Sequence, residues 1–221
     1  TVGVEGQLRL LRSAVTVVGC GGLGGWVIEG LARMGVGRLV LVDCDSFNES
    51  NLNRQSLATE GSLGRAKTEV ARERVAAVNA AVEVVARQMR AEAGNLAELL
   101  KGVDAVVDAL DTIPLRLALQ EAAAAAGIPL VHGAIAGFAG QVTTVFPGDA
   151  GLRRVYGGDD PPEHGIEWEL GNPAATPMMV AAWQIHEVVK LLLGRGEPLR
   201  DRLLVLDAEY GSVQCLDLAE L

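Results

Sequence analysis

The chain is poor in cysteine, and this excludes two kinds of protein. Only 3 of its 221 residues are cysteines, namely Cys20, Cys44 and Cys215, and no two of them form a C-x-x-C pair. A structural zinc site of the usual tetrahedral kind needs more cysteine ligands than this, so we predict no zinc. A disulfide framework is excluded for the same reason. The composition suits a reducing compartment, which we expect to be the cytoplasm.

Basic residues and unbroken apolar runs are also scarce. The chain has 19 lysines and arginines against 28 acidic residues, and its formal net charge is −9. Proteins that bind nucleic acids generally present a basic face, so no nucleic-acid partner is expected. The uncharged segment 122–140 contains Gly127-Ile128-Pro129, which predicts a helix end, a buried strand over 130–132 and a glycine loop. This interruption argues against a membrane span, and no membrane association is expected.

Short apolar runs alternate with helical patterns through the first half of the chain. The expected strands are 14–18, 38–42, 82–86, 105–109 and 130–132, and the expected helices are 23–34, 64–78, 95–100 and 113–126. Such alternation favours right-handed crossovers and a parallel sheet with helices on both faces. We therefore predict an α/β fold with a Rossmann-like, mostly parallel sheet, formed as a single domain over residues 1–221.

The pattern changes after residue 140. Residues 141–146 alternate between apolar and polar side chains as a half-buried strand does, which predicts a C-terminal antiparallel extension of the sheet. Residues 148–172 lack apolar periodicity, and a loop of this length is usually a lid or a binding loop. A long amphipathic helix is expected over 177–193, followed by a hairpin over 203–207 and 212–216.

A glycine turn joins the first expected strand to the first expected helix. Its sequence is Gly19-Cys20-Gly21-Gly22-Leu23-Gly24, and Asp43 follows at the end of the next strand. Such a turn places backbone N–H groups and a helix N-terminus against phosphates, and the acid has the spacing of one that binds ribose. The motif predicts a nucleotide site and by itself favours an NAD or FAD enzyme. Tight packing without a ligand is the alternative.

Two cations follow the second strand. Arg54 lies in the segment Asn51-Leu52-Asn53-Arg54-Gln55, and Lys67 comes shortly after it. A nicotinamide enzyme rarely needs two cations here, whereas a nucleoside triphosphate attacked at phosphorus does, because negative charge develops on its oxygens. Solvated surface charges are the alternative for either residue alone.

A second pair of carboxylates ends the strand 105–109. In the sequence Asp108-Ala109-Leu110-Asp111-Thr112, Asp111 emerges where the phosphates of a nucleotide should lie. A carboxylate at that place can bind Mg²⁺ together with phosphate oxygens. Asp111 or Thr112 can instead cap the following helix, and a metal role for Asp108 is left open.

These motifs, taken together and in this order, resemble those of the ThiF/MoeB/HesA family, whose members are relatives of the ubiquitin-activating enzymes. The similarity covers nearly the whole chain. Besides the glycine turn it rests on Asp43-x-Asp45, Asn51-x-x-Arg54-Gln55, Lys67, Asp108-x-x-Asp111, His132-Gly133-Ala134, Gly140-Gln141-Val142-Thr143, Pro177 and Glu187-x-x-Lys190.

The resemblance implies an ATP-dependent adenylyltransferase. Such an enzyme joins AMP to the C-terminal glycine carboxylate of a ubiquitin-like sulfur-carrier protein ending in Gly-Gly and releases pyrophosphate, in sulfur metabolism of the thiamine or molybdopterin type. The implied cofactors are ATP and Mg²⁺. The implied nucleotide-binding residues are Gly19, Gly21, Gly22, Leu23, Gly24, Asp43, Asp45, Asn51, Arg54, Gln55 and Lys67. Arg54, Lys67 and Asp111 would be catalytic, and Asp111 would bind Mg²⁺.

The resemblance also implies a division of labour along the chain. The half at about 1–135 would bind the nucleotide, and the half at about 136–221 would bind the carrier and form a homodimer. The loop at about 148–172 would cross over the flexible tail of the carrier. The helices 113–126 and 177–193 would supply the dimer contacts.

Several positions depart from the family pattern. The zinc C-x-x-C pairs are absent, and residues 148–172 contain no cysteine, so we expect no persulfide or thioester step on this chain. Thr112 stands where the family usually has Asn. An N-terminal helix that offers an arginine to a partner subunit is not apparent, because Arg9 and Arg12 lie too near the first strand. Cys44 and Cys215 are interpreted as ordinary strand residues.

Three alternatives remain open at this point. A relative within the family would activate a peptide or a carboxylate carried by a tRNA. An NAD(P)-dependent oxidoreductase would use the same glycine turn but leaves Arg54, Lys67 and Asp111 unexplained. A nucleotide-binding subunit without turnover is the third. His132, beside the site, is interpreted as a satisfied buried side chain, with a contact to substrate as the alternative.

Overall fold

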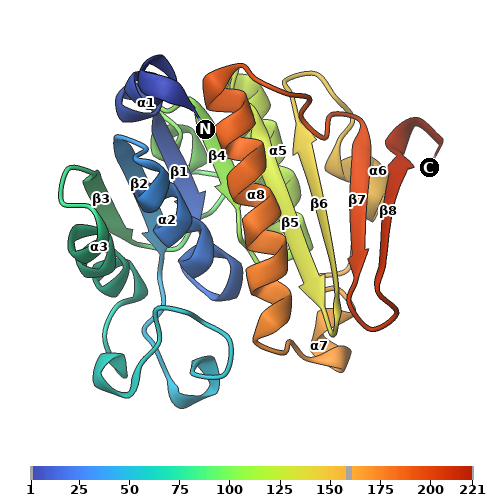
Figure 1. The fold of residues 1–221 in the computed structure, drawn as a ribbon. Coiled ribbons are helices and arrows are strands. Elements are labelled where there is room, and N and C mark those ends of the chain that lie inside the picture. The colour runs from blue at the N-terminus through green and yellow to red at the C-terminus, as the bar shows by residue number, and fades with distance from the viewer. Residues whose placement is uncertain (1, 158–160, 221) are drawn as a thin grey trace.

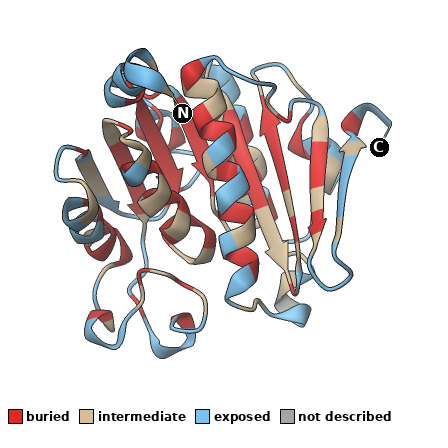
Figure 2. Cartoon of the chain, in the orientation of Figure 1, coloured by how far each residue is buried: buried red, intermediate tan, exposed pale blue. Residues whose placement is uncertain are grey.

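Apolar side chains on both faces of the first strand show that the sheet is covered on both sides. In β1 (Ala14–Val18), Val15 and Val17 pack into one core while Ala14 and Val18 pack into the other. This is the pattern of a central parallel strand between two layers of helices. Figure 2 shows the resulting burial, which is concentrated in the strands and in the helix faces against them.

The computed structural model describes residues 2–157 and 161–220, and within them one sheet of eight strands runs in the order β3-β2-β1-β4-β5-β6-β7-β8 (Figure 1). The other strands are β2 (Arg38–Asp43), β3 (Glu83–Gln88), β4 (Ala105–Asp108), β5 (Leu130–Ala136), β6 (Ala139–Val145), β7 (Arg202–Asp207) and β8 (Ser212–Asp217). The strands β1 to β5 pair in parallel, and β6, β7 and β8 continue the sheet antiparallel. The predicted fold class is confirmed.

Two layers of helices enclose the sheet. The helices are α1 (Gly3–Arg12), α2 (Gly22–Met34), α3 (Lys67–Val78), α4 (Leu96–Leu99), α5 (Ile113–Ala126), α6 (Leu152–Tyr156), α7 (Glu167–Leu170) and α8 (Ala175–Leu193). The helices α2, α3 and α8 cover one face of the sheet, and α4, α5 and α6 cover the other. Among the described residues, none of the helices combines the length and hydrophobicity that crossing a membrane requires.

The structure corrects three expectations about secondary structure. Residues 3–12 form the helix α1, which the sequence analysis did not predict. The strand at 130–132 does not break into a glycine loop but continues to Ala136, because Gly133 and Ala134 pair with β6. A Cβ atom at Gly133 would lie 2.5 Å from the amide carbon of Gln184, so glycine keeps the strand regular beneath α8.

The expected loop at 148–172 also contains ordered structure. It includes the short helices α6 and α7, which pack against α5 and β5 respectively. Residues 158–160 of that loop lie outside the described residues. The carboxyl ends of β1, β2, β4 and β5 face the end of the molecule where α7 and the loop after β2 lie, whereas α1 lies at the opposite end (Figure 1). Ligands of open parallel sheets bind at the carboxyl ends, which places the site.

Candidate active site

A cavity of about 240 Å³ opens at the carboxyl ends of β1, β2 and β4. The predicted residues that line it are Gly19, Gly21, Gly22, Leu23, Asp43, Asp45, Arg54, Gln55, Lys67 and Asp111. The remaining two, Gly24 and Asn51, are not among its lining residues. Segments as far apart in sequence as Gly19 and Asp111 therefore meet in one place, as the motif order predicted.

The glycines of the turn have different tasks. Gly19 has a φ of +98°, and a Cβ there would lie 2.4 Å from the carbonyl oxygen of Ala109. A Cβ at Gly24 would lie 1.8 Å from the carbonyl oxygen of Gly19, so Gly24 permits the tight turn without facing the cavity. At Gly21 and Gly22 the nearest protein atoms would be 3.5 and 3.7 Å away, which is ordinary contact. Their lack of a side chain leaves space for a ligand to approach the backbone.

The N-terminus of α2 has the character of an anion site. The helix begins at Gly22, its first turn contains no acidic residue, and Gly21 at the N-cap makes no side-chain capping hydrogen bond. The first N–H groups of such a helix point outward with partial positive charge. They are available to a phosphate in the cavity.

Asp43 is fixed at the end of β2 by two backbone donors. Its Oδ2 accepts a hydrogen bond from Cys20 N at 2.7 Å, and its Oδ1 accepts one from Asp45 N at 2.8 Å. Burial raises the pKa of Asp43, while Lys67 and these two N–H groups act in the opposite direction. Each carboxylate oxygen retains a lone pair for a further donor, such as a ribose hydroxyl.

Lys67 is held at the cavity by an ion pair. Its Nζ lies 3.1 Å from Asp45 Oδ2, and its side chain is only 8 % exposed. Burial by itself would raise the pKa of Asp45, but the hydrogen bond and charge of Lys67 outweigh it and lower the pKa. The two residues begin and end one loop, since Lys67 N also donates to the carbonyl of Asp45 at 3.0 Å.

Arg54 reaches the cavity from the loop after β2. Its Nη1 donates to Ser50 O and to Asn53 Oδ1, both at 2.9 Å, and both acceptors are neutral. Asn51 is buried, and its Oδ1 accepts from Asn48 N while its carbonyl accepts from Gln55 N. Asn51 thus shapes the loop that presents Arg54.

The two carboxylates after β4 have separate environments. Asp111 is exposed and lines the cavity. Asp108 is fully buried, accepting hydrogen bonds from Leu110 N at 3.0 Å and from His132 Nδ1 at 2.7 Å. Thr112 occupies the N-cap of α5 but makes no side-chain capping bond there. Asp111 can therefore contact a ligand in the cavity, whereas both carboxylate oxygens of Asp108 are bound to protein donors in the interior.

His132 matches its interpretation as a satisfied buried side chain. It is fully buried, its Nδ1 pairs with Asp108, and its Nε2 lies 3.0 Å from the hydroxyl of Tyr156. Burial lowers the pKa of His132, and the neighbouring Asp108 opposes this only in part. The ring is neutral at physiological pH and holds structure together rather than binding substrate.

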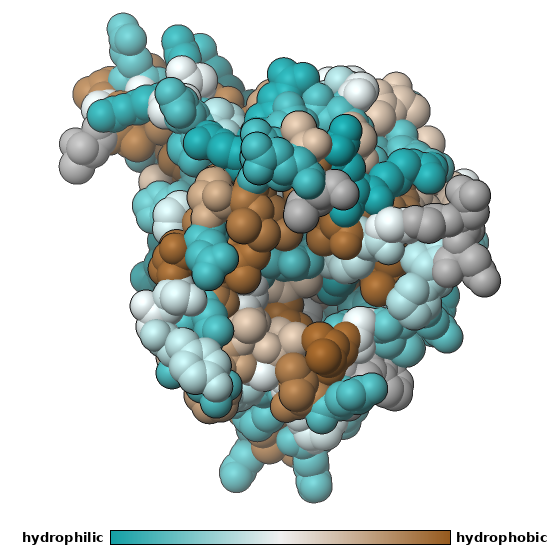
Figure 3. All heavy atoms as spheres, turned by 90° about the vertical axis from the view of Figure 1, so that its right-hand side faces the viewer, coloured by the Kyte–Doolittle hydropathy of each residue, from teal (hydrophilic) through white to brown (hydrophobic). Residues whose placement is uncertain are grey.

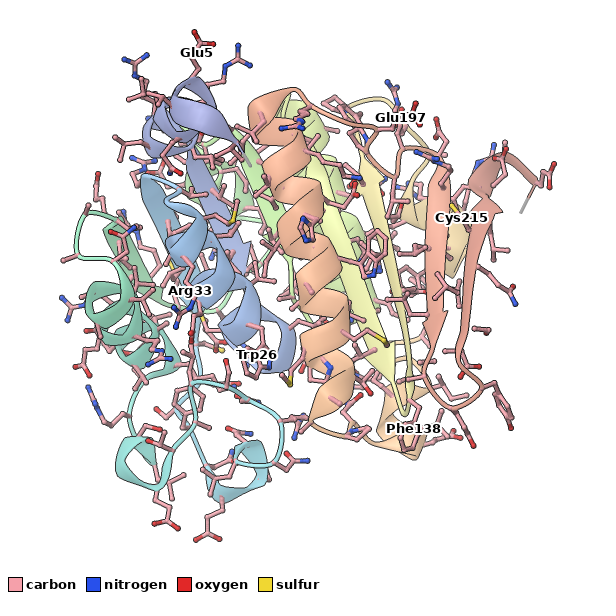
Figure 4. The ribbon with its side chains drawn as sticks, viewed as in Figure 1. Glu5, Trp26, Arg33, Phe138, Glu197 and Cys215 are labelled. Atoms are coloured by element: carbon pink, nitrogen blue, oxygen red, sulfur yellow. The ribbon has the colours of Figure 1, made fainter. Side chains whose placement is uncertain are left out.

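The interpretation of Cys44 as a strand residue is wrong. Cys44 follows the end of β2, is exposed and lines the cavity beside Asp43 and Asp45. Burial and the charge of Asp45 raise the pKa of its thiol, so it is not an activated nucleophile. Cys215 lies on the edge strand β8, away from the glycine turn (Figure 4).

The sequence analysis did not single out several residues that line the cavity. They are Met89, Arg90, Ala91, Leu115, Arg116, Ile135, Glu167 and Asn172. The contribution of residues 89–91, which follow β3, could have been predicted from the sequence. A parallel strand beside β2 has its carboxyl end at the same edge of the sheet as the cavity. Glu167 and Asn172 belong to the segment without periodicity, where no sequence signal indicated a contact.

The donor set fits a nucleotide with a divalent cation. Lys67, Arg54 and Arg90 bring positive charge to the cavity, while Asp43 and Asp111 bring carboxylate oxygens. The buried oxygen Gln55 Oε1, on a side chain that lines the cavity, has no hydrogen-bond partner among the described residues. Oxygen ligands of this kind, combined with phosphate, are what Mg²⁺ prefers in proteins.

Arg9 and Arg12 lie far from this site within the same chain. They belong to α1, at the other end of the sheet, and Arg9 Nη1 donates to the carbonyl of Leu193 at 2.9 Å. A helix does precede the first strand, contrary to expectation, but neither arginine contributes to the cavity of its own chain.

Curated relatives share much of this chain. The SAMP-activating enzyme E1 of Haloferax volcanii is 43% identical over 210 residues, which are 94% of this chain and 77% of that protein. The sulfur carrier protein adenylyltransferase of Thermus thermophilus is 41% identical over 222 residues, covering 97% of this chain and 82% of that protein. The mouse protein named adenylyltransferase and sulfurtransferase MOCS3 is 39% identical over 213 residues, covering 95% of this chain but 46% of its own length.

The fold has solved counterparts. The crystal structure of E. coli MccB with MccA-N7isoASN superimposes with a TM-score of 0.85 at 22% identity, over 97% of this chain and 67% of that one. At that identity the likeness concerns the fold alone. The model of the ThiF family matches residues 1–220. With the motifs, the cavity and the relatives in agreement, the chain belongs to the ThiF family.

Proposed function

We propose that this protein is an ATP-dependent adenylyltransferase that activates the C-terminal carboxylate of a ubiquitin-like sulfur-carrier protein and releases pyrophosphate. The observation that carries the proposal is the convergence of Arg54, Lys67 and Asp111 on the cavity at the glycine turn. A nicotinamide enzyme has no use for this set, whereas charge developing on a triphosphate requires it. The names of the relatives from Haloferax and Thermus support the same activity.

The protein's own groups act by alignment and by charge. The N–H groups at Gly21 and Gly22 and the start of α2 orient the phosphates, and Asp43 orients the ribose. Arg54 and Lys67 stabilise the charge that builds on the phosphate oxygens as the carrier carboxylate attacks the α-phosphorus and pyrophosphate leaves. No covalent intermediate on the protein is needed. Cys44, whose pKa is raised, is not required.

Asp111 is the residue proposed to hold Mg²⁺. Its exposed carboxylate lies three residues beyond the end of β4 and lines the same cavity as the glycine turn. When bound, Mg²⁺ would neutralise part of the charge on the phosphate oxygens. The second carboxylate of the motif, Asp108, has both oxygens occupied by protein donors and is not assigned to the metal.

A second cavity, of about 320 Å³, is proposed to receive the tail of the carrier. It shares Arg116, Ile135 and Glu167 with the nucleotide cavity, so the two are adjacent. Its lining includes small residues of β5 and β6, namely Ala134, Ala136, Ala139 and Gly140. Residues of the segment 148–172, among them Tyr156 and Ile166, also line it. A narrow tail that ends in Gly-Gly suits such a passage.

The remaining expectations about organisation are proposals as well. We propose that the half up to about residue 135 binds the nucleotide, that the later half binds the carrier, and that two copies form a homodimer. The side chains of Met178 and Trp183, 45 % and 38 % exposed on α8, support a contact through that helix. A cytoplasmic location is consistent with three cysteines and no disulfide framework.

The decisive experiment is exchange of radiolabelled pyrophosphate into ATP, measured with Mg²⁺ and a panel of small carrier proteins ending in Gly-Gly. Carrier-dependent exchange is the expected result. The matched control is the same carrier with its last glycine removed, which should support none. If the protein binds NAD but not ATP, the proposal is wrong. Exchange with a short peptide but with no carrier would replace the proposed substrate.

A further inference from the structure

A chain of hydrogen bonds runs through the interior directly beneath the nucleotide cavity. It joins Asp108 on β4, His132 on β5, Tyr156 on α6 and Arg116 on α5. Asp108 and His132 are fully buried, and Arg116 is 4 % exposed. These four residues, here called the buried relay, come from four different elements. None of them is assigned a task in the proposed reaction.

The hydrogen bonds of the relay all point one way. A carboxylate can only accept, so His132 donates from Nδ1 to Asp108, and its Nε2 is left to accept. Burial raises the pKa of Tyr156, against the charge of Arg116, so its hydroxyl keeps the proton and donates to Nε2. The same hydroxyl oxygen accepts from Arg116 Nη1 at 2.7 Å and from Gln141 Nε2 at 3.1 Å. Every member therefore has a partner of the correct kind.

The two ends of the relay bind the same residue, Leu110, one through its N–H and the other through its carbonyl. The N–H of Leu110 donates to Asp108 Oδ1 at 3.0 Å. The carbonyl of Leu110 accepts from Arg116 Nε at 3.2 Å and from Arg116 Nη2 at 2.6 Å. The next residue along the chain is Asp111. Leu110 is thus fixed from both sides, and the backbone that carries the exposed carboxylate of Asp111 is held by a buried network.

We propose that Arg116 and Tyr156 are positioning residues that set the turn 110–111, and with it the carboxylate of Asp111, from the adjacent carrier cavity. The guanidinium suits this task because it lines both cavities and offers a planar fork to one carbonyl while a third N–H reaches Tyr156. Tyr156 belongs to the segment 148–172 and lines the carrier cavity. The inference rests on the proposed function in that Asp111 is taken as the Mg²⁺ ligand.

The first test requires no ligand. Amide hydrogen exchange is measured in the protein alone for wild type, Tyr156→Phe and Tyr210→Phe. Tyr210, which is 80 % exposed in the β7–β8 turn, provides a matched loss of one hydroxyl. We expect exchange of the Leu110 amide, which donates to Asp108 Oδ1, to become about tenfold faster in Tyr156→Phe, because Arg116 loses the acceptor that orients it. Unchanged exchange in a folded Tyr156→Phe would overturn the inference.

The second test asks whether the effect travels through Arg116. The Mg²⁺ concentration that half-saturates ATP binding is measured by calorimetry for Tyr156→Phe, Arg116→Lys and the double variant. We expect each single change to raise it several-fold and the double change to add little, since both break one connection. Independent, multiplying effects would overturn the coupling.

The outcome separates the inference from the proposed function. Asp111→Asn is included in the same titration. If it leaves the Mg²⁺ requirement unchanged, Asp111 is not the ligand and that part of the proposed function fails. The hydrogen-exchange result still decides whether Arg116 and Tyr156 set the turn. If Asp111→Asn raises the half-saturating Mg²⁺ concentration and the relay variants do not, the inference fails and the proposed function stands.

Discussion

The mouth of the nucleotide cavity and the layer beneath it are built from the same kinds of side chain in opposite states. At the mouth, Asp111 is exposed and Arg54 is half-buried, and within the described part of the chain Arg54 donates only to neutral oxygens of Ser50 and Asn53. Beneath it, Asp108 and Arg116 are buried and satisfied within the relay. A charged side chain that is buried and fully paired stabilises the fold. A charged side chain at a cavity whose protein partners are neutral can bind a charged ligand.

The molecular surface shows a second contrast, between hydrophobic and charged residues. Seen from the side of β8, hydrophobic residues gather around a hollow while hydrophilic residues dominate the rim (Figure 3). At the far end of the sheet, α1 presents charged side chains such as Glu5 to solvent (Figure 4). Because the charged side chains at the mouth are exposed or half-buried and those of the relay are buried, substitutions at the mouth should change activity but not stability. Substitutions in the relay should change both.

Arg54→Ala should show the largest effect. We expect pyrophosphate exchange to fall by about 10²–10³-fold, because a cation aimed at developing charge is lost. The free energy of unfolding, measured with urea, should change by less than about 0.5 kcal/mol, since no buried partner is left behind. Arg12→Ala, at an exposed position on α1, is the control and should leave exchange unaltered. Retained exchange in Arg54→Ala would remove this residue from the mechanism.

Comparing Asp108→Asn with Asp111→Asn tests the difference between the two regions most directly. Asp108→Asn should lower the free energy of unfolding by about 3 kcal/mol, because His132 and Arg116 lose a buried charged partner. Asp111→Asn should leave stability nearly unchanged but raise the Mg²⁺ concentration that half-saturates ATP binding. Urea denaturation and calorimetry on both variants check this. The contrast breaks down if both variants show the same profile.

How far the sequence predicts this molecule differs between the two regions. The strands of the first half were placed within a few residues, because parallel strands buried on both faces appear as short apolar runs between helices. The mouth was predicted as well, since Asp43, Arg54 and Asp111 follow strand ends that must share one edge. Asn51 and Gly24 proved to build the loop and the turn rather than to line the cavity.

The relay could not have been predicted in the same way. Its members lie on β4, β5, α5 and α6, and Tyr156 comes from a segment without periodicity. Arg116 within an amphipathic helix has the pattern of a surface cation, and only the packing of α6 against α5 shows that it is buried. The helix α1 was missed because its residues combine three charges and two glycines in ten positions.

The pH dependence of stability offers a smaller effect that belongs to the relay alone. Burial lowers the pKa of His132 below its ordinary value of 6.5. The unfolded chain therefore takes up a proton near pH 6.5, whereas the folded chain does so only at lower pH, and the stabilising contribution is lost as the pH falls below 6.5. The slope should approach about 1.4 kcal/mol per pH unit.

Urea denaturation at pH 7.5 and 5.5 tests this prediction. The difference between the two pH values should shrink in His132→Gln and persist in His186→Gln, because His186 is exposed on α8. An equal pH dependence in both variants would assign the titration to groups outside the relay. His132→Gln should lose activity only under conditions in which the variant begins to unfold.

The smallest effect should come from a surface ion pair that belongs to neither region. Glu29 on α2 pairs with Arg74 at 2.9 Å and with Arg33 at 2.7 Å, and the hydrogen bond from Arg74, opposed by burial, lowers the pKa of Glu29 from its ordinary value of 4.5. Its contribution is complete above pH 4.5 and is lost as the pH falls below that value. Both arginines are about half exposed, so Glu29→Gln should cost only about 0.5–1 kcal/mol at pH 7. Urea midpoints at pH 7 and pH 3.5, with the exposed Glu5→Gln as control, should show a smaller cost at the lower pH. Pyrophosphate exchange should be unaffected by Glu29→Gln. This variant therefore gives the size of effect that a surface substitution alone produces, with which the effects at the mouth and in the relay are compared.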